Sequence, residues 1–347
     1  MSLVESSAVP HRVICFGEVL LRLGAPGRQL LLQTPQLEVH VGGAEANVAV
    51  SLAQLGHAAA MVSTLPPGPL GGAALGELRR FGVDTRHVAL RDGRMGLYFL
   101  VNGALQRPSE VLYDRAGSAF ALADPAGYDW PRILDGADWL LVSGVTPALG
   151  AACARAAQEA VEAATRAGVP VAFDGNYRSK LWDCWDGQPP ARLRALCAHV
   201  DLLFASHRDI DVMLGDAGRS GSPLDLTLGA AERAFAAFPR LRRMTTTLRT
   251  QRSVDHHALS AVMVTRGGAL SQTDEYELPQ IVDRIGTGDA FAAGVLHGLM
   301  CGQDDASALR FGLAAACLKH SIPGDFNRVS VADVAALVAD SGYSVRR

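Results

Sequence analysis

Residues 139–174, WLLVSGVTPALGAACARAAQEAVEAATRAGVPVAFD, carry the pattern that decides the fold. The apolar run Trp139–Val145 predicts a buried strand, and the alanine-rich stretch Ala148–Ala167 predicts a helix that ends at Gly168. Val169–Phe173 predicts the next strand. Because strands that alternate with helices pair in parallel, we expect an α/β protein whose mostly parallel sheet is covered by helices on both faces.

Outside this unit, the sequence predicts further strands and two segments that do not alternate with helices. Val200–Ala205 and Ala261–Thr265 predict additional strands of the same sheet. Glu18–Val41 and Met95–Ser118 are strand-like but contain no intervening helix. We therefore expect residues 11–340 to form one domain, in which segments of about 18–41 and 95–118 build a small antiparallel lid over the site.

The bulk composition limits the classes of protein that are possible. Of 347 residues, 49% are hydrophobic and 19% are charged, so a large core is expected. A net charge of −3 without a long basic run argues against nucleic acid or an acidic membrane as partner. No run approaches the about 18 apolar residues of a membrane span, and Met1–Arg12 lacks the pattern of a signal peptide. These features favour a cytoplasmic protein.

Cysteine and histidine spacing predicts no metal site. The six cysteines form no CxxC pair, which favours reduced, packed thiols over a zinc site or a disulfide framework. The adjacent His256 and His257 have no partner at metal-ligand spacing, so solvated loop histidines are expected. Thr245–Thr250, with Arg249, is expected to precede a strand and to lie near a bound nucleotide.

The most informative stretch for chemistry is 281–291, IVDRIGTGDAF, which precedes a largely apolar helix. Gly286 and Gly288, with Thr287 between them, allow consecutive backbone N–H groups to point into one concavity. The helix N-terminus adds a partial positive charge there, so the segment predicts a hole for an anion such as a phosphate. Asp289 could accept the proton of a substrate hydroxyl beside that hole. The alternative is a tight turn in which Asp289 only caps the helix.

A second glycine-rich entry to a helix supports the chemical interpretation. In Val41–Ala49, VGGAEANVA, Gly42 and Gly43 allow the backbone to approach a ligand, and Asn47 can form directed hydrogen bonds. Together, the two motifs closely resemble the signatures of the ribokinase-like sugar kinases, also called phosphofructokinase-B type. The resemblance extends from about Val13 to about Val329.

The resemblance implies a ribokinase-like three-layer α/β/α core with a small β-sheet lid, and ATP and Mg²⁺ as cofactors. It implies that Asp289 is the catalytic base and that the anion hole consists of Gly286, Thr287 and Gly288. Many members carry Asn-x-x-Glu near the magnesium ion, whereas this chain has Ser206-His207-Arg208-Asp209. Asp209 could still hold a metal-bound water, but we expect Mg²⁺ to be held chiefly by the nucleotide phosphates and water. The residues assigned to the nucleotide are Ser206, Asp209, Gly267, Gly286 and Gly288.

Four segments narrow the resemblance to 2-keto-3-deoxygluconate kinases: Leu97–Phe99, Tyr113–Ser118, Asp174–Arg178 and Pro323–Asn327. The ketoacid substrate of such kinases carries a carboxylate, with which arginine pairs well. The residues assigned to the substrate are Gly42, Gly43, Asn47, Tyr98, Tyr113, Arg115, Arg178 and Asp325.

Several alternatives stay open at this point. A kinase of a neutral sugar, such as fructose or ribose, or of an inositol-derived keto sugar would leave Arg115 and Arg178 as surface residues. A non-catalytic sensor of sugar acids or nucleotides would be expected to lose Asp289, and a dehydrogenase would need a GxGxxG fingerprint that is missing. The sequence decides neither between the gluco and galacto epimers nor between a monomer and a homodimer or larger assembly.

Overall fold

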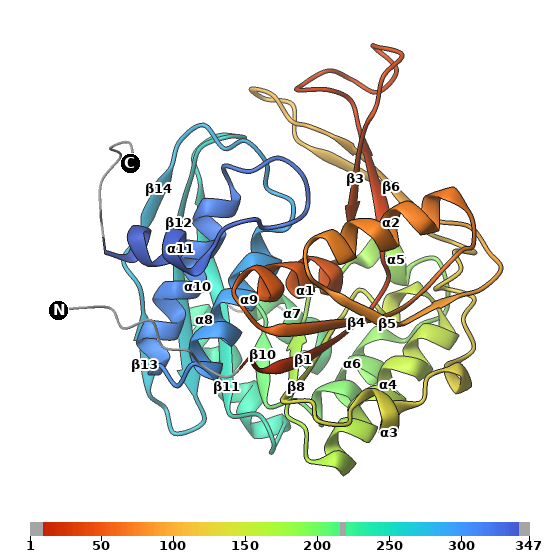
Figure 1. Ribbon diagram of the computed structural model, residues 1–347. Coiled ribbons are helices and arrows are strands. Elements are labelled where there is room, and N and C mark those ends of the chain that lie inside the picture. Colours follow the sequence, from red (N-terminus) through yellow and green to blue (C-terminus); the bar gives the residue numbers. More distant parts are fainter. Residues whose placement is uncertain (1–9, 216–219, 340–347) are drawn as a thin grey trace.

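The computed structural model describes residues 10–215 and 220–339, and its main feature is a ten-stranded sheet (Figure 1). The strand order is β13-β12-β11-β10-β9-β8-β1-β4-β5, and β14 pairs with β12. All pairs from β11 to β5 are parallel, whereas β12, β13 and β14 join antiparallel at one edge. The mostly parallel sheet is thus confirmed. Its strands are β1 (Arg12–Phe16), β4 (Ala58–Leu65), β5 (Asp84–Leu90), β8 (Trp139–Ser143), β9 (Val171–Asp174), β10 (Leu202–Phe204), β11 (Arg243–Gln251), β12 (His257–Thr265), β13 (Leu270–Gln272) and β14 (Tyr276–Leu278).

Alternate residues of each central strand point to opposite faces of the sheet. In β1, Val13 and Cys15 join one core, whereas Ile14 and Phe16 join the other, and all four are fully buried. A strand that is buried on both faces must be apolar at every position, which explains why these strands appear as continuous apolar runs in the sequence.

Helices cover both faces and give the three layers that the sequence predicts. One face carries α1 (Ala44–Gln54), α2 (Pro69–Arg80), α9 (Thr287–Met300) and α10 (Asp305–Lys319), on which α11 (Val331–Val338) packs. The other face carries α3 (Trp130–Ile133), α4 (Ala151–Ala167), α5 (Ser179–Trp182), α6 (Pro189–Cys197), α7 (His207–Leu214) and α8 (Pro223–Ala237). Helix α4 ends at Gly168, which has the left-handed backbone (φ 72°) that a helix C-cap favours.

A separate four-stranded sheet projects from the main body (Figure 1). It consists of β2 (Leu20–Gly24), β3 (Glu38–Gly42), β6 (Gly96–Val101) and β7 (Glu110–Asp114), in the order β3-β2-β6-β7. Pairs β2–β3 and β6–β7 are antiparallel, and a parallel β2–β6 pair joins the two hairpins. The small sheet predicted from the two helix-free segments is confirmed, although its centre is parallel.

Two local features differ from expectation. Thr245–Thr250 precedes the strand β12, as predicted, but itself lies within a strand, β11, where Thr246 pairs with Val262 of β12. Threonine is polar but β-branched, and β-branched residues favour strands, so this polar run forms a strand although it lacks an apolar pattern. His257 is fully buried at the start of β12 rather than solvated, whereas the partly exposed His256 lies 2.9 Å from Glu277.

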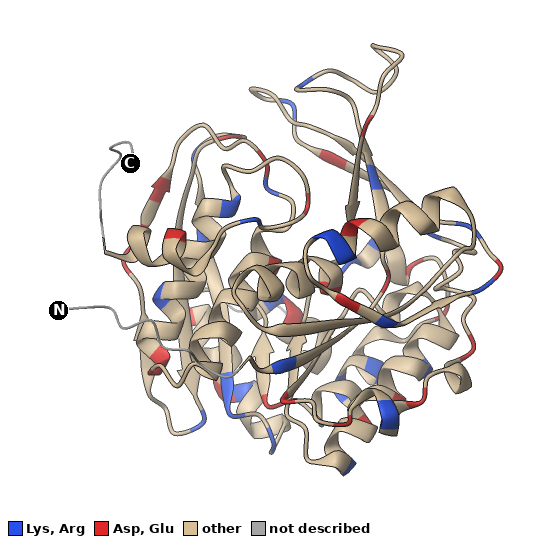
Figure 2. Cartoon of the chain, viewed as in Figure 1, with Lys and Arg blue, Asp and Glu red and all other residues tan. Residues whose placement is uncertain are grey.

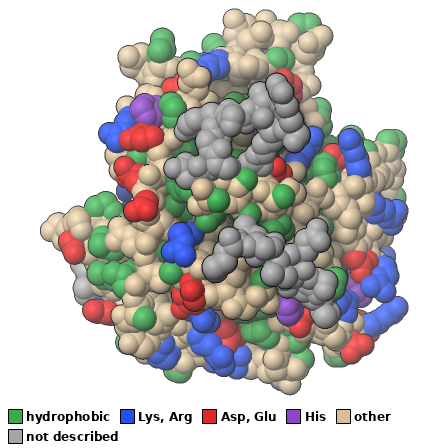
Figure 3. All heavy atoms as spheres, turned by 60° about the vertical axis from the view of Figure 1, so that its left-hand side comes forward, with side chains coloured by type: hydrophobic (Ala, Val, Ile, Leu, Met, Phe, Trp, Pro, Cys, Tyr) green, Lys and Arg blue, Asp and Glu red, His purple; other side chains and the backbone are tan. Residues whose placement is uncertain are grey.

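Charges of both signs are interspersed over the molecule (Figures 2 and 3). No helix within residues 10–215 and 220–339 has the length and apolar character needed to cross a bilayer. The expected domain, 11–340, includes residues 216–219 and 340, which lie outside the described part, as does most of the segment Met1–Arg12.

Candidate active site

A cavity of about 900 Å³ lies where the small sheet faces the carboxyl ends of the central strands. Tyr98 and Tyr113 line it from the small sheet, Asn47 from α1, and Asp289 from the first turn of α9. Asp174, the last residue of β9, lies at its floor. This is the edge at which open α/β sheets bind ligands.

The N-terminus of α9 opens directly into this cavity. Gly286 is the N-cap residue with φ 77°, and a Cβ atom there would lie 2.0 Å from the Asp325 carbonyl oxygen, so only glycine fits. No side chain caps the helix, and Thr287 Oγ1 instead donates to the Arg284 carbonyl at 3.0 Å. The first amides of a helix lack intrahelical acceptors, so those of Thr287 and Gly288 are free for an anion.

Asp289 is held by a hydrogen bond across two helices. Asn47 Nδ2 donates to Asp289 Oδ2 at 2.7 Å. Burial raises the pKa of Asp289 to about 7, because the negative charges of Glu45 and Asp325 add to the desolvation and the Asn47 hydrogen bond offsets only part of it. The other amide atom of Asn47, Oδ1, is buried and has no partner among the described residues. It is therefore available to a ligand.

Two further carboxylates lie near Asp289, the buried Glu45 and the half-buried Asp174, and sequence reasoning gave neither a role. Glu45 Oε1 accepts hydrogen bonds from the Ser143 backbone and hydroxyl and from Thr146 Oγ1, at 2.7 to 2.9 Å, which fixes the start of α1 to the end of β8. Burial raises the pKa of Asp174 well above its ordinary value, and the nearby charge of Asp289 adds to this effect. The negative charge of Glu45 raises the cost of ionising Asp289.

An ion-pair network joins the small sheet to the loop before α9. Arg22 of β2 lies 2.9 Å from Asp325 and donates to Asp283 at 2.7 Å and 3.1 Å. Tyr98 Oη donates to Asp325 Oδ2 at 2.8 Å. Burial raises the pKa of Asp325 to about 6, despite the opposing charge of Arg22. Asp283 also accepts from the Ile285 backbone, so the network fixes the approach to the anion hole.

The two arginines assigned to a substrate carboxylate both line the cavity. Arg115 is 8% exposed, and its Nε donates to Glu18 Oε2 at 2.6 Å, which orients the guanidinium. Arg178 is exposed at the start of α5 and forms no hydrogen bond or ion pair with the described residues. Three more arginines line the same cavity: Arg28, Arg249 and Arg284. Of these, only Arg249 was named from sequence, in a segment expected near a bound nucleotide. The cavity therefore suits an anionic ligand.

Four of the assigned residues do not line the cavity. Gly42 lies behind Asp325, since a Cβ atom there would lie 2.3 Å from Oδ2 of that carboxylate. Ser206 and Asp209 form the capping box of α7, in which Asp209 Oδ2 accepts from the Ser206 backbone and hydroxyl at 2.8 and 2.6 Å. Gly267 lies in the turn between β12 and β13. Their nucleotide contacts stay a prediction. The assigned residues in the lining are Gly43, Asn47, Tyr98, Tyr113, Arg115, Arg178, Gly286, Thr287, Gly288, Asp289 and Asp325.

The fold and the open helix N-terminus beside a carboxylate are features of an enzyme that transfers phosphoryl groups. The family model described as pfkB family carbohydrate kinase matches residues 10–327, which is most of the chain. The protein belongs to this family and is a carbohydrate kinase, and kinases of the family bind ATP. The resemblance and the fold class predicted from sequence are thereby confirmed.

The chain is similar to several proteins that are named as kinases of 2-dehydro-3-deoxy sugars. The chain is 35% identical over 346 residues to the 2-dehydro-3-deoxygalactonokinase of Haloferax volcanii, an alignment that covers 96% of this chain and 99% of the relative. It is 27% identical to the 2-dehydro-3-deoxygluconokinase of Thermoproteus tenax, with 90% and 89% covered. The crystal structure of a 2-dehydro-3-deoxygluconokinase from Thermotoga maritima superimposes with a TM-score of 0.90 at 39% identity, covering 95% of this chain and 99% of that one.

Proposed function

We propose that the protein transfers the γ-phosphate of ATP to a hydroxyl of 2-keto-3-deoxygluconate, with Asp289 as the base. The observation that carries this proposal is that one cavity contains both a carboxylate beside an anion-binding helix start and arginines that can bind a substrate carboxylate. Asp289 stands beside an uncapped helix N-terminus, and Arg115 and Arg178 line the same space. A neutral sugar has no group that would pair with these arginines, whereas a sugar acid has a carboxylate.

Asp289 has the protonation behaviour that proton abstraction requires. With a pKa of about 7, a large share of this carboxyl is ionised at neutral pH and is still basic enough to accept a hydroxyl proton. The hydrogen bond from Asn47 leaves one carboxylate oxygen free for the substrate. The first amides of α9 would stabilise the negative charge that develops on the transferred phosphoryl group.

The substrate would lie between the small sheet and α9. Arg115, oriented by Glu18, and the exposed Arg178 would bind the carboxylate. Tyr98 and Tyr113 would pack against the carbon chain, and Asn47 Oδ1 would accept a hydrogen bond from a hydroxyl. Since Arg115 adjoins the small sheet, we also propose that this sheet acts as a lid that excludes water during transfer.

Asp209 is a poor ligand for the Mg²⁺ that accompanies ATP. Its two oxygens accept hydrogen bonds from Ser206 and from the Tyr177 backbone, so direct ligation would break the α7 cap. We therefore propose that the nucleotide phosphates and water hold the ion, which neutralises phosphate charge.

A coupled assay of ADP release, with ATP and Mg²⁺, tests the proposal. The panel consists of 2-keto-3-deoxygluconate, its galacto epimer, gluconate, fructose and ribose. Activity confined to the two ketoacids supports the proposal, and their kcat/KM ratio identifies the epimer. The Haloferax volcanii relative makes the galacto epimer the second candidate. Activity on fructose or ribose alone would refute the proposed role of the arginines, but it would not contradict the proposed role of Asp289 as the base.

A further inference from the structure

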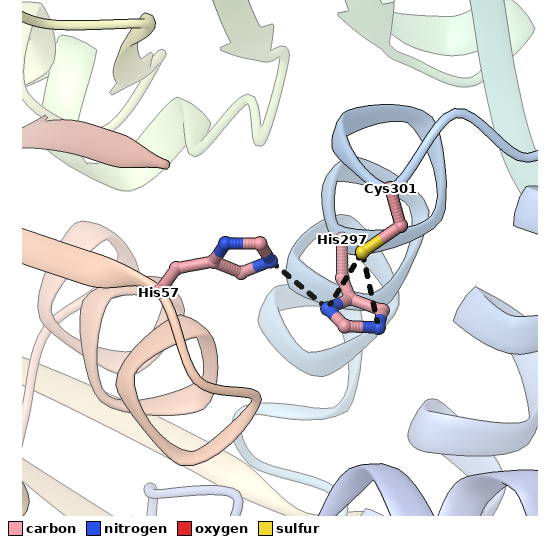
Figure 4. Close-up of side chains that lie close together, drawn as sticks. All are labelled: His57, His297 and Cys301. Carbon is pink, nitrogen blue, oxygen red and sulfur yellow. Dashed lines mark hydrogen bonds between the residues drawn. The ribbon is translucent and has the colours of Figure 1, made fainter. Parts of the chain in front are cut away.

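A second cluster of reactive side chains joins the other ends of α1 and α9 (Figure 4). His57 follows the end of α1, His297 lies in the last turn of α9, and Cys301 is the C-cap residue of α9. Nε2 of His57 lies 2.9 Å from Nδ1 of His297, and Sγ of Cys301 lies 3.8 Å and 3.9 Å from the two ring nitrogens of His297. One donor atom from each residue lies within 4.8 Å of the others.

The cluster is distinct from the catalytic cavity but shares its helices. Asn47 and Asp289 connect α1 and α9 near their first turns, and His57 and His297 connect the same pair near their last turns. Eight residues separate Asp289 from His297, which corresponds to about 12 Å along the axis of α9. None of the three cluster residues lines the cavity. The kinase chemistry proposed above therefore does not use them.

The donor set matches a particular class of metal ion. Two imidazole nitrogens and a thiolate are ligands that Zn²⁺ and Cu⁺ prefer and that Mg²⁺ and Ca²⁺ do not. We propose that His57, His297 and Cys301 bind one zinc-class ion, with water in the fourth position. Because Cys301 is exposed, the ion and that water can reach the site from solvent.

Closing the three side chains around one ion requires movements of up to about 1.2 Å. Zn–N bonds of about 2.0 Å and a Zn–S bond of about 2.3 Å in a tetrahedron place nitrogens roughly 3.3 Å apart and nitrogen and sulfur roughly 3.6 Å apart. Relative to Nδ1 of His297, the His57 nitrogen must move away by about 0.4 Å and the Cys301 sulfur must approach by about 0.3 Å. The Cys301 sulfur and the His57 nitrogen lie within 4.8 Å of each other, so this pair must close by up to about 1.2 Å. The His297 ring stacks on Phe311, with centroids 4.6 Å apart, so His297 is held in place while the exposed Cys301 adjusts.

Burial keeps both imidazoles in the neutral form. His57 and His297 are 8% and 6% exposed, and burial lowers the pKa of both imidazoles to about 4. Both rings are thus neutral at pH 7, the form that ligates metals. Burial raises the pKa of the Cys301 thiol, so ligation releases its proton. Nδ1 of His57 is buried without a partner among the described residues, which leaves Nε2 as the nitrogen directed into the cluster.

Cobalt(II) is the probe that tests this site, because it substitutes for zinc and gives a thiolate-to-metal charge-transfer band. The reduced, metal-free full-length protein is titrated with Co²⁺ and then with Zn²⁺. We expect one Co²⁺ per chain with a thiolate band, and loss of that band when one equivalent of Zn²⁺ is added. Co²⁺ bound by cavity carboxylates would give no such band, so the two sites are distinguishable.

Cysteine variants identify the sulfur. Cys301→Ser should abolish the band and weaken Zn²⁺ binding at least tenfold, while its kcat in Mg²⁺ alone stays unchanged, which shows that it is folded. Cys184→Ser is the matched control, because Cys184 is also a free, exposed thiol but lies far along the chain in a different segment. The thiolate-to-cobalt band should persist in Cys184→Ser. His57→Gln should weaken Zn²⁺ binding by a similar factor. A wild-type protein without the band, or a band that survives in Cys301→Ser, would overturn the proposal.

Discussion

Replacing Asp289 by asparagine tests the centre of the proposed mechanism. The amide has almost the same shape, and its oxygen can still accept the hydrogen bond that Asn47 donates at 2.7 Å. The variant therefore keeps the geometry and loses only the base. General base catalysis contributes about 10²- to 10⁴-fold, which corresponds to roughly 3 to 5 kcal/mol of transition-state free energy. We expect kcat to fall by that factor, while the Kd for ATP stays within about twofold.

The pH profile gives an independent reading of the same residue. The pKa of Asp289 is raised to about 7, so in the wild-type protein kcat/KM should fall about tenfold per pH unit below pH 7. The coupled ADP-release assay measures this profile between pH 5 and 9, with coupling enzymes in excess. Asp289→Asn should show no inflection near pH 7. A kcat that is unchanged in this variant, or a profile that stays flat in the wild type, would refute the assignment.

The remaining predictions concern stability, recognition and the helix starts. The folded-state pKa of Asp289 lies above its ordinary value, so ionisation of this residue destabilises the fold as the pH rises toward 7 and above. Asp289→Asn should therefore raise Tm more at pH 8 than at pH 4. An equal change in Tm at both pH values would exclude this linkage. Arg178→Met should raise KM for the ketoacid by at least tenfold. Arg155 is an exposed arginine of α4, and Arg155→Met should leave KM unchanged. Equal effects of the two substitutions would show that Arg178 does not bind the substrate. Gly286→Ala should abolish activity and lower Tm, because its Cβ would meet the Asp325 carbonyl at 2.0 Å, and a fully active variant would contradict the backbone geometry. Ser206→Ala should cost about 1 kcal/mol of stability through the α7 cap, measured by urea unfolding; unchanged ATP affinity would argue against its predicted nucleotide contact.

Local sequence pattern was sufficient to predict the fold class and the Gly286–Asp289 start of α9. The strand–helix–strand unit at 139–174 and the Gly286–Asp289 turn each depend on interactions between residues close in sequence. The periodicity of apolar residues indicates which face of an element is buried. Glycines before a helix indicate a helix N-terminus whose backbone amides can bind a ligand. The small sheet was predictable in the same way, because its strands come from two segments whose pattern contains no helix.

Partner choice was decided by tertiary structure alone. No sequence rule indicates that Arg22 joins Asp283 and Asp325, or that Glu18 orients Arg115, because these pairs are up to about 300 residues apart. The pKa of Asp289 likewise depends on burial and on Glu45, which reach it only through the packing of α1 against α9. His57 and His297 carry no recognisable spacing, yet folding places their ring nitrogens 2.9 Å apart. Sequence determines which residues can do the chemistry, whereas the electrostatic field and the contacts around them arise only when distant segments meet in the folded chain.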